Sequence, residues 1–378
     1  MNNHPINDDF FAADKLGFDP RPGVMLRRRP IIVPNISGVS TAWQIVYASR
    51  TGFGAPIPAS ATVIVPDPAS IQPGGRILLY CPEFHGLGGG CAPSRQLVFG
   101  SEPEAPRIEA AVARGWIVAI ADGLGLGMNG VGPHLWPAGS AAAHAGLDAA
   151  RATVELLNLE AGAGCVVWGY GDGGRAALWT AELQPRYAPD IDLRGVVAGA
   201  VFSDLRQLAQ DLDGTPCAGL VLAAIAGSIR AYSHLPLRHI LTEEGHLVVG
   251  LAGELDLVSL LERGRGPVGQ WCERPDPWND PLWGYVMTNE RTSGEIPRVP
   301  VHLYHGTDDP VIPTAMGRAV AEHYRNRGIA VSWQDYPADH SATAAAATGD
   351  ALDRAADFLA RHPAPQPPPL HPDSGSAA

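Results

Sequence analysis

Apolar and polar residues alternate along one stretch of this chain and form short unbroken apolar runs along others. The alternation extends from about residue 42 to 65 and is rich in β-branched residues, which predicts antiparallel strands. Short continuous apolar runs are typical of strands that are buried on both faces of a parallel sheet. Such runs occupy residues 76–80, 116–121, 165–168, 195–202, 299–304 and 330–335.

Helical patterns lie between these predicted strands. Residues 106–114 have the pattern of a helix, and the Ala-rich stretch 141–157 has a helical spacing of apolar positions. Repetition of strand, helix and strand predicts a doubly wound, mostly parallel α/β sheet.

The alternation is interrupted between about residues 204 and 296. This part contains the uncharged stretch 214–229, which is shorter than the ~20 apolar residues that a membrane span requires. We therefore predict a buried or lid helix there, in a helical cap inserted between two strands of the sheet. The predicted division is core 1–204, cap or lid 205–296, core 297–361, and a tail 362–378 too poor in apolar residues to order itself.

Composition and charge exclude several classes of protein. Charged residues are 17% of the chain and hydrophobic residues 46%, which excludes a disordered chain and a coiled coil. The formal net charge is −12, and no basic run is longer than Arg27-Arg28-Arg29, so no nucleic-acid partner is predicted.

The ends and the cysteines give further expectations. Residues 1–10 have neither a basic n-region nor an apolar h-region, which predicts a cytoplasmic protein unless the N-terminus has been trimmed from a secreted one. The five cysteines form no CxxC pair, and no HExxH pair accompanies them, so no metal site is predicted. Gly125 to Gly130 fit GxGxxG, but prolines follow where a helix should begin, and no cofactor is predicted.

The most informative segment is Val166-Val167-Trp168-Gly169-Tyr170-Gly171-Asp172-Gly173-Gly174. A strand turns into a helix with small residues on both sides of the turn, as in the G-x-S-x-G nucleophile elbow. Glycine stands where the elbow has its serine, and it has no side chain that could attack a substrate. Taken alone, the segment could also be a Gly-rich turn without chemistry, which is the less favoured of the two interpretations.

Two later motifs favour the elbow interpretation. His305-Gly306-Thr307-Asp308-Asp309 follows one predicted strand, and Asp335-Tyr336-Pro337-Ala338-Asp339-His340 follows the next. Nucleophile, acid and histidine in this order are typical of serine hydrolases whose elbow lies on an α/β sheet. Taken alone, His340 would be read as a surface histidine.

With these motifs and Cys91-Ala92-Pro93-Ser94, the chain resembles the secretory lipase family of α/β-hydrolases, typified by yeast lipase A, over nearly its whole length. The resemblance implies Asp309 as the acid, with Asp308 as its alternative, His340 as the base, and Gly171 as a vacant nucleophile position. It implies oxyanion donors at the backbone of Asp172 and in the loop of His85 and Gly86. Further implied features are substrate contacts by Phe84 and Tyr170 and a disulfide between Cys91 and Cys272.

A histidine–aspartate pair without its serine still faces a polarising pocket. Our hypothesis is that His340 acts directly as a general base, in non-covalent hydrolysis, elimination or cyclisation of a small apolar carbonyl compound or ester. The space of the missing CH2OH holds about one water, whose share of liquid volume is ~30 Å3.

Three alternatives stand beside this hypothesis. Asp172 could be an aspartyl nucleophile, although its side chain begins the helix beyond the turn and suits a helix cap. The chain could be an inactive hydrolase that serves as a binding module. Gly171 could also be a substitution introduced into an active lipase.

Overall fold

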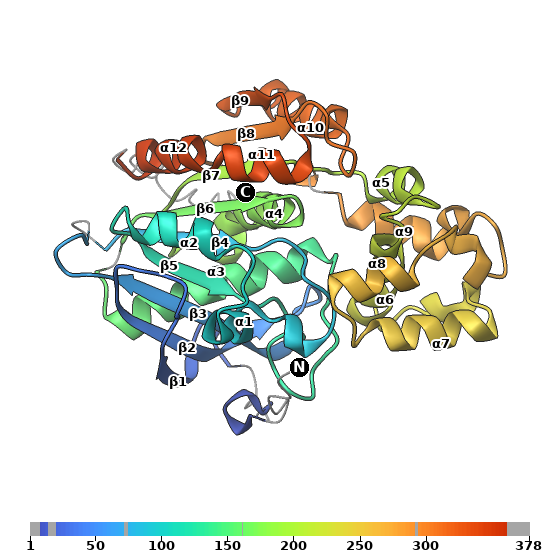
Figure 1. Cartoon of the computed structure of the whole chain (residues 1–378), viewed down its shortest axis with the longest axis horizontal. Helices are drawn as coiled ribbons and strands as arrows, with labels where there is room; N and C mark the ends of the chain where they lie inside the picture. Colours follow the sequence, from blue (N-terminus) through green and yellow to red (C-terminus); the bar gives the residue numbers. More distant parts are fainter. Residues whose placement is uncertain (1–7, 14–19, 72–74, 161, 292–293, 361–378) are drawn as a thin grey trace, which may run out of the picture.

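The computed structural model describes residues 8–13, 20–71, 75–160, 162–291 and 294–360. Within these ranges one nine-stranded sheet forms the centre of the molecule, in the order β1-β2-β3-β5-β4-β6-β7-β8-β9 (Figure 1). The strands are β1 (Met25–Ile31), β2 (Val39–Arg50), β3 (Pro56–Pro66), β4 (Ile77–Cys81), β5 (Ile117–Ala121), β6 (Cys165–Tyr170), β7 (Leu193–Gly199), β8 (Val301–Gly306) and β9 (Val331–Tyr336).

The sheet is parallel from β5 to β9, and β1, β2 and β3 extend it as an antiparallel edge. Strand β4 shows why its sequence is apolar at every position. Ile77 and Leu79 pack in one hydrophobic cluster, and Leu78 and Tyr80 pack in another on the opposite face. The predicted doubly wound sheet is thereby confirmed.

Helices cover both faces of the sheet. Helices α3 (Gly139–Leu157), α4 (Asp172–Tyr187) and α10 (Thr314–Asn326) pack in the cluster that contains Ile77 and Leu79. Helices α2 (Ala105–Val112) and α12 (Thr348–Ala360) pack in the cluster on the other face. The remaining core helices are η1 (Asp9–Phe11), η2 (Gly89–Cys91), α1 (Pro93–Phe99) and α11 (His340–Ala346).

Further helices lie between β7 and β8, in the span where the cap is expected, and form the body at the right of Figure 1. The uncharged stretch 214–229 largely becomes α6, as a buried helix of this body. The helices are α5 (Leu205–Leu212), α6 (Gly219–Ala231), η3 (Leu237–Ile240), α7 (Glu243–Ala252), α8 (Leu257–Arg263), η4 (Val268–Trp271), η5 (Pro277–Asn279) and α9 (Pro281–Asn289). We call residues 205–289 the cap.

The first strand and the C-terminal tail differ from the other elements in how they compare with the sequence analysis. Strand β1 was not predicted, because it carries Arg27, Arg28 and Arg29 and lies at the edge of the sheet, where one side needs no strand partner. The tail expected at residues 362–378 lies outside the described residues.

Candidate active site

The turn between β6 and α4 has the form of an elbow. Gly171 is the residue before α4 and has φ 57° and ψ −120°, a left-handed conformation that favours glycine. Its N–H donates to the carbonyl of Gly199 at 2.9 Å. A methyl group added at Gly173 would lie 2.1 Å from the carbonyl oxygen of Cys81, and one at Gly174 would lie 2.4 Å from that of Gly199. The small residues therefore let the elbow press closely against the neighbouring chain.

Asp309 and His340 meet beside this elbow. Asp309 follows β8, and His340 begins α11 after β9. The Oδ2 atom of Asp309 lies 2.6 Å from Nδ1 of His340, and its Oδ1 accepts the backbone N–H groups of Val311 and Ile312, each at 2.9 Å. Although burial alone would raise the pKa of Asp309, interactions with His305 and His340 hold it well below the usual range. Asp309, rather than Asp308, is thus the carboxylate that orients the histidine.

A second carboxylate lies on the other side of the imidazole. Oε2 of Glu83 lies 3.6 Å from Nε2 of His340. A methyl group added at Gly171 would lie 3.4 Å from that nitrogen and 3.5 Å from the same Glu83 oxygen. Glu83, His340 and the vacant nucleophile position therefore face one small space.

The two carboxylates decide the charge of His340. Burial alone would lower its pKa, but Asp309 and Glu83 stabilise the imidazolium and raise the pKa to about 9. His340 is consequently protonated at neutral pH. The predicted role as a general base needs the neutral ring, so this geometry is unfavourable to it.

A buried network holds Glu83 in place. Its backbone N–H donates to Oε1 of Glu104 at 2.7 Å, and Arg107 lies 3.0 Å from both Oε1 of Glu83 and Oε2 of Glu104. Tyr80 also donates a hydrogen bond to Glu104. Sequence reasoning missed Glu83, although it lies in the same loop after β4 where an oxyanion group was expected.

The side chain of His85, one of the two residues predicted for that loop, lies beside two buried glutamates. Nε2 of His85 lies 3.2 Å from Oε1 of Glu104 and 3.6 Å from Oε1 of Glu102, in the buried network. Gly86 forms a β-bridge with Asp256 of the cap. Glu83 and Phe84 of this loop line the same cavity as His340, whereas Glu102 and Glu104 hold the His85 ring in the buried network. An oxyanion donor from His85 or Gly86 stays a prediction.

The donors of His85, Glu102 and Glu104 lie within 4.8 Å of one another, a spacing that could hold a metal ion. Burial raises the pKa of Glu102 to about 7 despite the nearby His85. The carboxylate of Glu104 is already occupied by Arg107, Tyr80 and the Glu83 N–H. Because these donors leave it little capacity as a metal ligand, we interpret the cluster as a hydrogen-bond network that shapes the loop.

Asp172 and Tyr170 flank the vacant position along the chain. Asp172 is the first residue of α4, where backbone N–H groups are free to bind an anion. Burial raises the pKa of its carboxyl group to about 6, against the opposing effect of Arg175. Tyr170 was predicted to contact substrate, but it is buried, and its hydroxyl donates to the backbone carbonyl of His340 at 2.8 Å. It therefore supports the histidine instead.

An apolar cavity of about 330 Å3 leads from Gly171 and His340 into the cap. Phe84, for which the resemblance implies a substrate contact, contributes to its wall. We call it the cap cavity. Its other lining side chains come mainly from α5, α6, α8 and the turn after Asp309: Phe202, Leu205, Leu208, Ala209, Leu212, Cys217, Leu220, Val221, Ala224, Leu257, Leu261, Val311 and Ile312.

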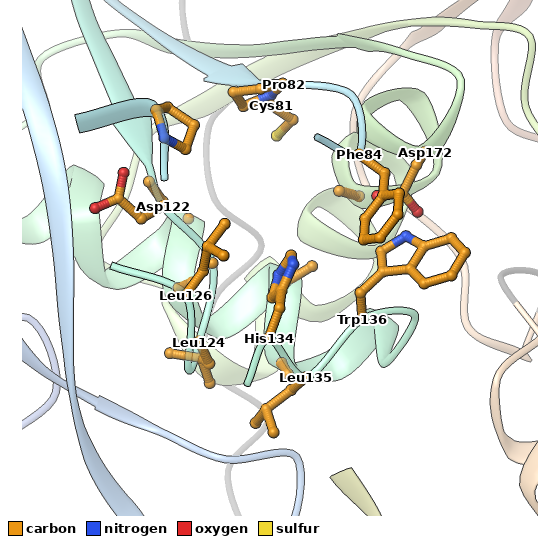
Figure 2. A pocket seen from close by; sticks show the side chains of 18 of the residues that line it. Cys81, Pro82, Phe84, Asp122, Leu124, Leu126, His134, Leu135, Trp136 and Asp172 are labelled. Carbon is orange, nitrogen blue, oxygen red and sulfur yellow. The ribbon is translucent and has the colours of Figure 1, made fainter. Parts of the chain in front are cut away.

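A smaller cavity of about 80 Å3 lies behind the same loop. Figure 2 shows Phe84, Trp136 and Asp172 side by side at one end of it and His134 at its centre. Phe84 and Trp136 stack with ring centroids 4.2 Å apart, and together with Asp172 they also line the cap cavity. Burial lowers the pKa of His134 to about 4, so its ring is neutral.

The disulfide implied by the family resemblance is not formed. Cys91 and Cys272 are both free and buried. The Cys91 sulfur lies 4.0 Å from the carbonyl oxygen of Leu255, whereas Cys272 forms a β-bridge with Leu241. Each cysteine therefore packs against its own neighbours.

Comparison with known proteins agrees with the geometry. A family model described as secretory lipase matches residues 98–250. A probable inactive lipase of Mycobacterium tuberculosis is 28% identical over 348 residues, which cover 86% of this chain and 76% of the relative. Lipase 5 of Candida albicans is 27% identical over 354 residues, with coverage of 86% and 74%. Candida antarctica lipase A in its closed state aligns with a TM-score of 0.86 at 19% identity, covering 95% of this chain and 87% of that one.

These matches confirm the resemblance to the secretory lipase family and the α/β-hydrolase fold. They also correct the expected cytoplasmic location. The matching family is described as secretory, and similar lipases of Malassezia furfur and Malassezia globosa are named secreted, which points to an extracellular protein. Among the helices of the described residues, none combines the length and apolar character needed to cross a membrane.

Proposed function

We propose that this α/β-hydrolase, a relative of the secretory lipases, hydrolyses an ester with a long apolar chain without forming an acyl-serine intermediate. The observation that carries the proposal is the Asp309–His340 pair, joined at 2.6 Å and open to the cap cavity. A module that only binds ligand has no need of a buried carboxylate that fixes the histidine ring in this orientation.

In the proposed reaction a water occupies the space that Gly171 leaves beside His340 and attacks the carbonyl carbon. His340 donates a proton to the departing alcohol oxygen, because its pKa of about 9 makes it an acid at neutral pH. Asp309 orients the ring and stabilises its charge.

The oxyanion of the tetrahedral intermediate is assigned to the N-terminus of α4. The backbone N–H of Asp172 comes directly after the vacant position, and the helix dipole favours negative charge there. A preorganised donor of this kind contributes about 3–4 kcal/mol to transition-state stabilisation.

The cap cavity suggests the kind of substrate. Its wall is formed by leucine, valine, isoleucine, alanine and phenylalanine side chains, which match an acyl or alkyl chain. Relatives from Malassezia are named triacylglycerol lipases, which supports an ester of lipid character.

A second candidate function is the binding of an apolar ligand without turnover. It is favoured by Gly171 and by the name of the Mycobacterium tuberculosis relative, a probable inactive lipase.

The test compares two octanoate esters with the purified full chain. p-Nitrophenolate leaves without help from an acid, whereas ethoxide needs a proton. We expect His340→Gln to lower kcat for ethyl octanoate by about 10²–10⁴-fold, and to lower it much less for p-nitrophenyl octanoate. His246→Gln, an exposed histidine of α7, is the matched control and should leave both rates unchanged.

The two candidate functions give different results. Equal losses for both esters in His340→Gln would contradict the general-acid role. A wild-type chain that hydrolyses neither ester but binds octanoate would support the binding module.

A further inference from the structure

We propose that Glu83 is the general base of this site and replaces the missing serine as the group that activates the nucleophile. The inference deepens the proposed function and rests on it, since it assigns the proton acceptor for the attacking water.

Glu83 lies close to both His340 and the vacant nucleophile position. Oε2 of Glu83 lies 3.6 Å from Nε2 of His340 and 3.5 Å from where a side chain at residue 171 would begin. A water in the space left by the serine side chain would therefore lie within reach of both residues. Glu83 also lines the cap cavity, so a substrate ester would reach the same point.

Arg107 and Glu104 hold Glu83 in this position. Arg107 donates a hydrogen bond to Oε1 of Glu83 at 3.0 Å, and the other oxygen, Oε2, faces His340. The backbone N–H of Glu83 is fixed by Glu104, which is itself buried and bound by Arg107 and Tyr80. A carboxylate that merely filled a surface position would have no need of a buried network.

The charge and the contacts of the neighbouring groups leave the role of base to Glu83. His340 is already protonated, and Asp309 is occupied by His340 and two backbone N–H groups. The carboxylate of Asp172 lies beside Phe84 and Trp136 in Figure 2. Glu83 is consequently the base that faces the water. The other ionisable groups whose charges interact with it are His85, Arg107, Tyr170, Asp172, Tyr304 and His340.

The proposed proton transfers involve only the water, the substrate, Glu83 and His340. Oε2 of Glu83 accepts a proton from water as the water oxygen bonds to the carbonyl carbon. The carbon–alkoxide bond of the tetrahedral intermediate then breaks, and the alkoxide takes the proton from Nε2 of His340. The products are a carboxylic acid and an alcohol. The proton on Glu83 passes to Nε2 of His340 across their 3.6 Å contact, which restores the starting charges.

The experiment uses p-nitrophenyl octanoate, for which the acid step is unimportant and the base step is isolated. We expect Glu83→Gln to lower kcat by about 10²–10⁴-fold with little change in KM. Glu83→Asp keeps a carboxylate at this position and should lose less kcat. Glu322→Gln, an exposed glutamate of α10, is the control and should match the wild type.

A second measurement separates catalysis from a structural role. The pKa of His340, followed by NMR, should fall in Glu83→Gln, because one of its two carboxylate partners is removed. A folded Glu83→Gln chain that keeps the wild-type kcat would overturn the assignment while leaving the proposed function intact. An acyl adduct recovered on Glu83 would also overturn it, since the residue would then be a nucleophile. A wild-type chain without any turnover would instead refute the proposed function, and the assignment with it.

Discussion

The side chain that most distinguishes this site is His340, because it contacts a carboxylate through each ring nitrogen. Asp309 accepts from Nδ1 and Glu83 lies beside Nε2. In a serine hydrolase the second nitrogen contacts the serine hydroxyl and must be free to accept a proton. Here the second carboxylate stabilises the proton already present, so the residue works as an acid.

This charge state predicts how a restored serine would behave. In Gly171→Ser the new side chain would meet His340 and Glu83 at ordinary contact distances, although φ of 57° costs about 1–3 kcal/mol for a residue other than glycine. With a pKa of about 9, only about one His340 ring in a hundred is neutral at pH 7. We therefore expect slow labelling of the serine by a fluorophosphonate at pH 7 and a rise toward pH 9.

The double variant Gly171→Ser with Glu83→Gln should shift this rise toward neutral pH, because loss of Glu83 lowers the pKa of His340. Adding His340→Gln to Gly171→Ser should abolish the labelling and serves as the control. Fast labelling of Gly171→Ser at pH 7 would show that His340 is neutral in the folded protein.

At the scale of elements, the position of the site depends on how closely α4 approaches the sheet. Gly169, Gly173 and Gly174 are the residues that permit this approach. A methyl group added at Gly173 would collide with the carbonyl oxygens of Cys81 and Pro82 at 2.1 and 2.8 Å. Since both obstacles are backbone atoms, neither can move aside cheaply.

Gly173→Ala should accordingly destabilise the fold by at least about 2 kcal/mol, measured as a lower urea midpoint of unfolding. The control is Gly349→Ala in α12, where a methyl group would have no neighbour within 4 Å. That exposed helical position should gain up to about 1 kcal/mol. Equal effects at the two positions would refute the close approach as the reason for Gly173.

The elements were predictable where burial dictates composition. The apolar runs 76–80 and 116–121 became β4 and β5, because a central parallel strand is covered on both faces. The edge strand β1 escaped prediction, since Arg27 to Arg29 carry no such signature.

Only part of the candidate site was predictable from the sequence. The order of motifs favoured the elbow, because chain order fixes which strand ends carry the motifs, and the family resemblance implied Asp309 and His340. It did not give Glu83. The direction of a loop side chain depends on long-range partners, here Glu104 and Arg107, which lie more than twenty residues further along the chain.

At the scale of the whole molecule, a buried carboxylate next to the end of the cap connects the cap to the core through one ion pair and two hydrogen bonds. Glu290 follows α9 and lies 3.0 Å from Arg175 of α4. It also accepts the hydroxyl of Tyr232 at 2.7 Å and the N–H of Gly139 at 2.7 Å. One buried carboxylate thus joins Tyr232 of the cap to the elbow helix and to α3.

The depth of the cap cavity sets the length of chain that can bind. Ala224 of α6 lines the cap cavity and also a smaller cavity beyond it. Ala224→Phe should exclude the terminal two or three carbons of a long chain, which are worth about 0.8 kcal/mol each. We expect the Kd of cis-parinaric acid, followed by its fluorescence, to rise by more than tenfold, while turnover of p-nitrophenyl acetate stays unchanged. Ala319→Phe on the exposed face of α10 adds the same ring outside the cavity and should alter neither measurement. Unchanged affinity in Ala224→Phe would mean that the chain binds elsewhere, because a phenyl ring at this position cannot leave the cavity at its present length.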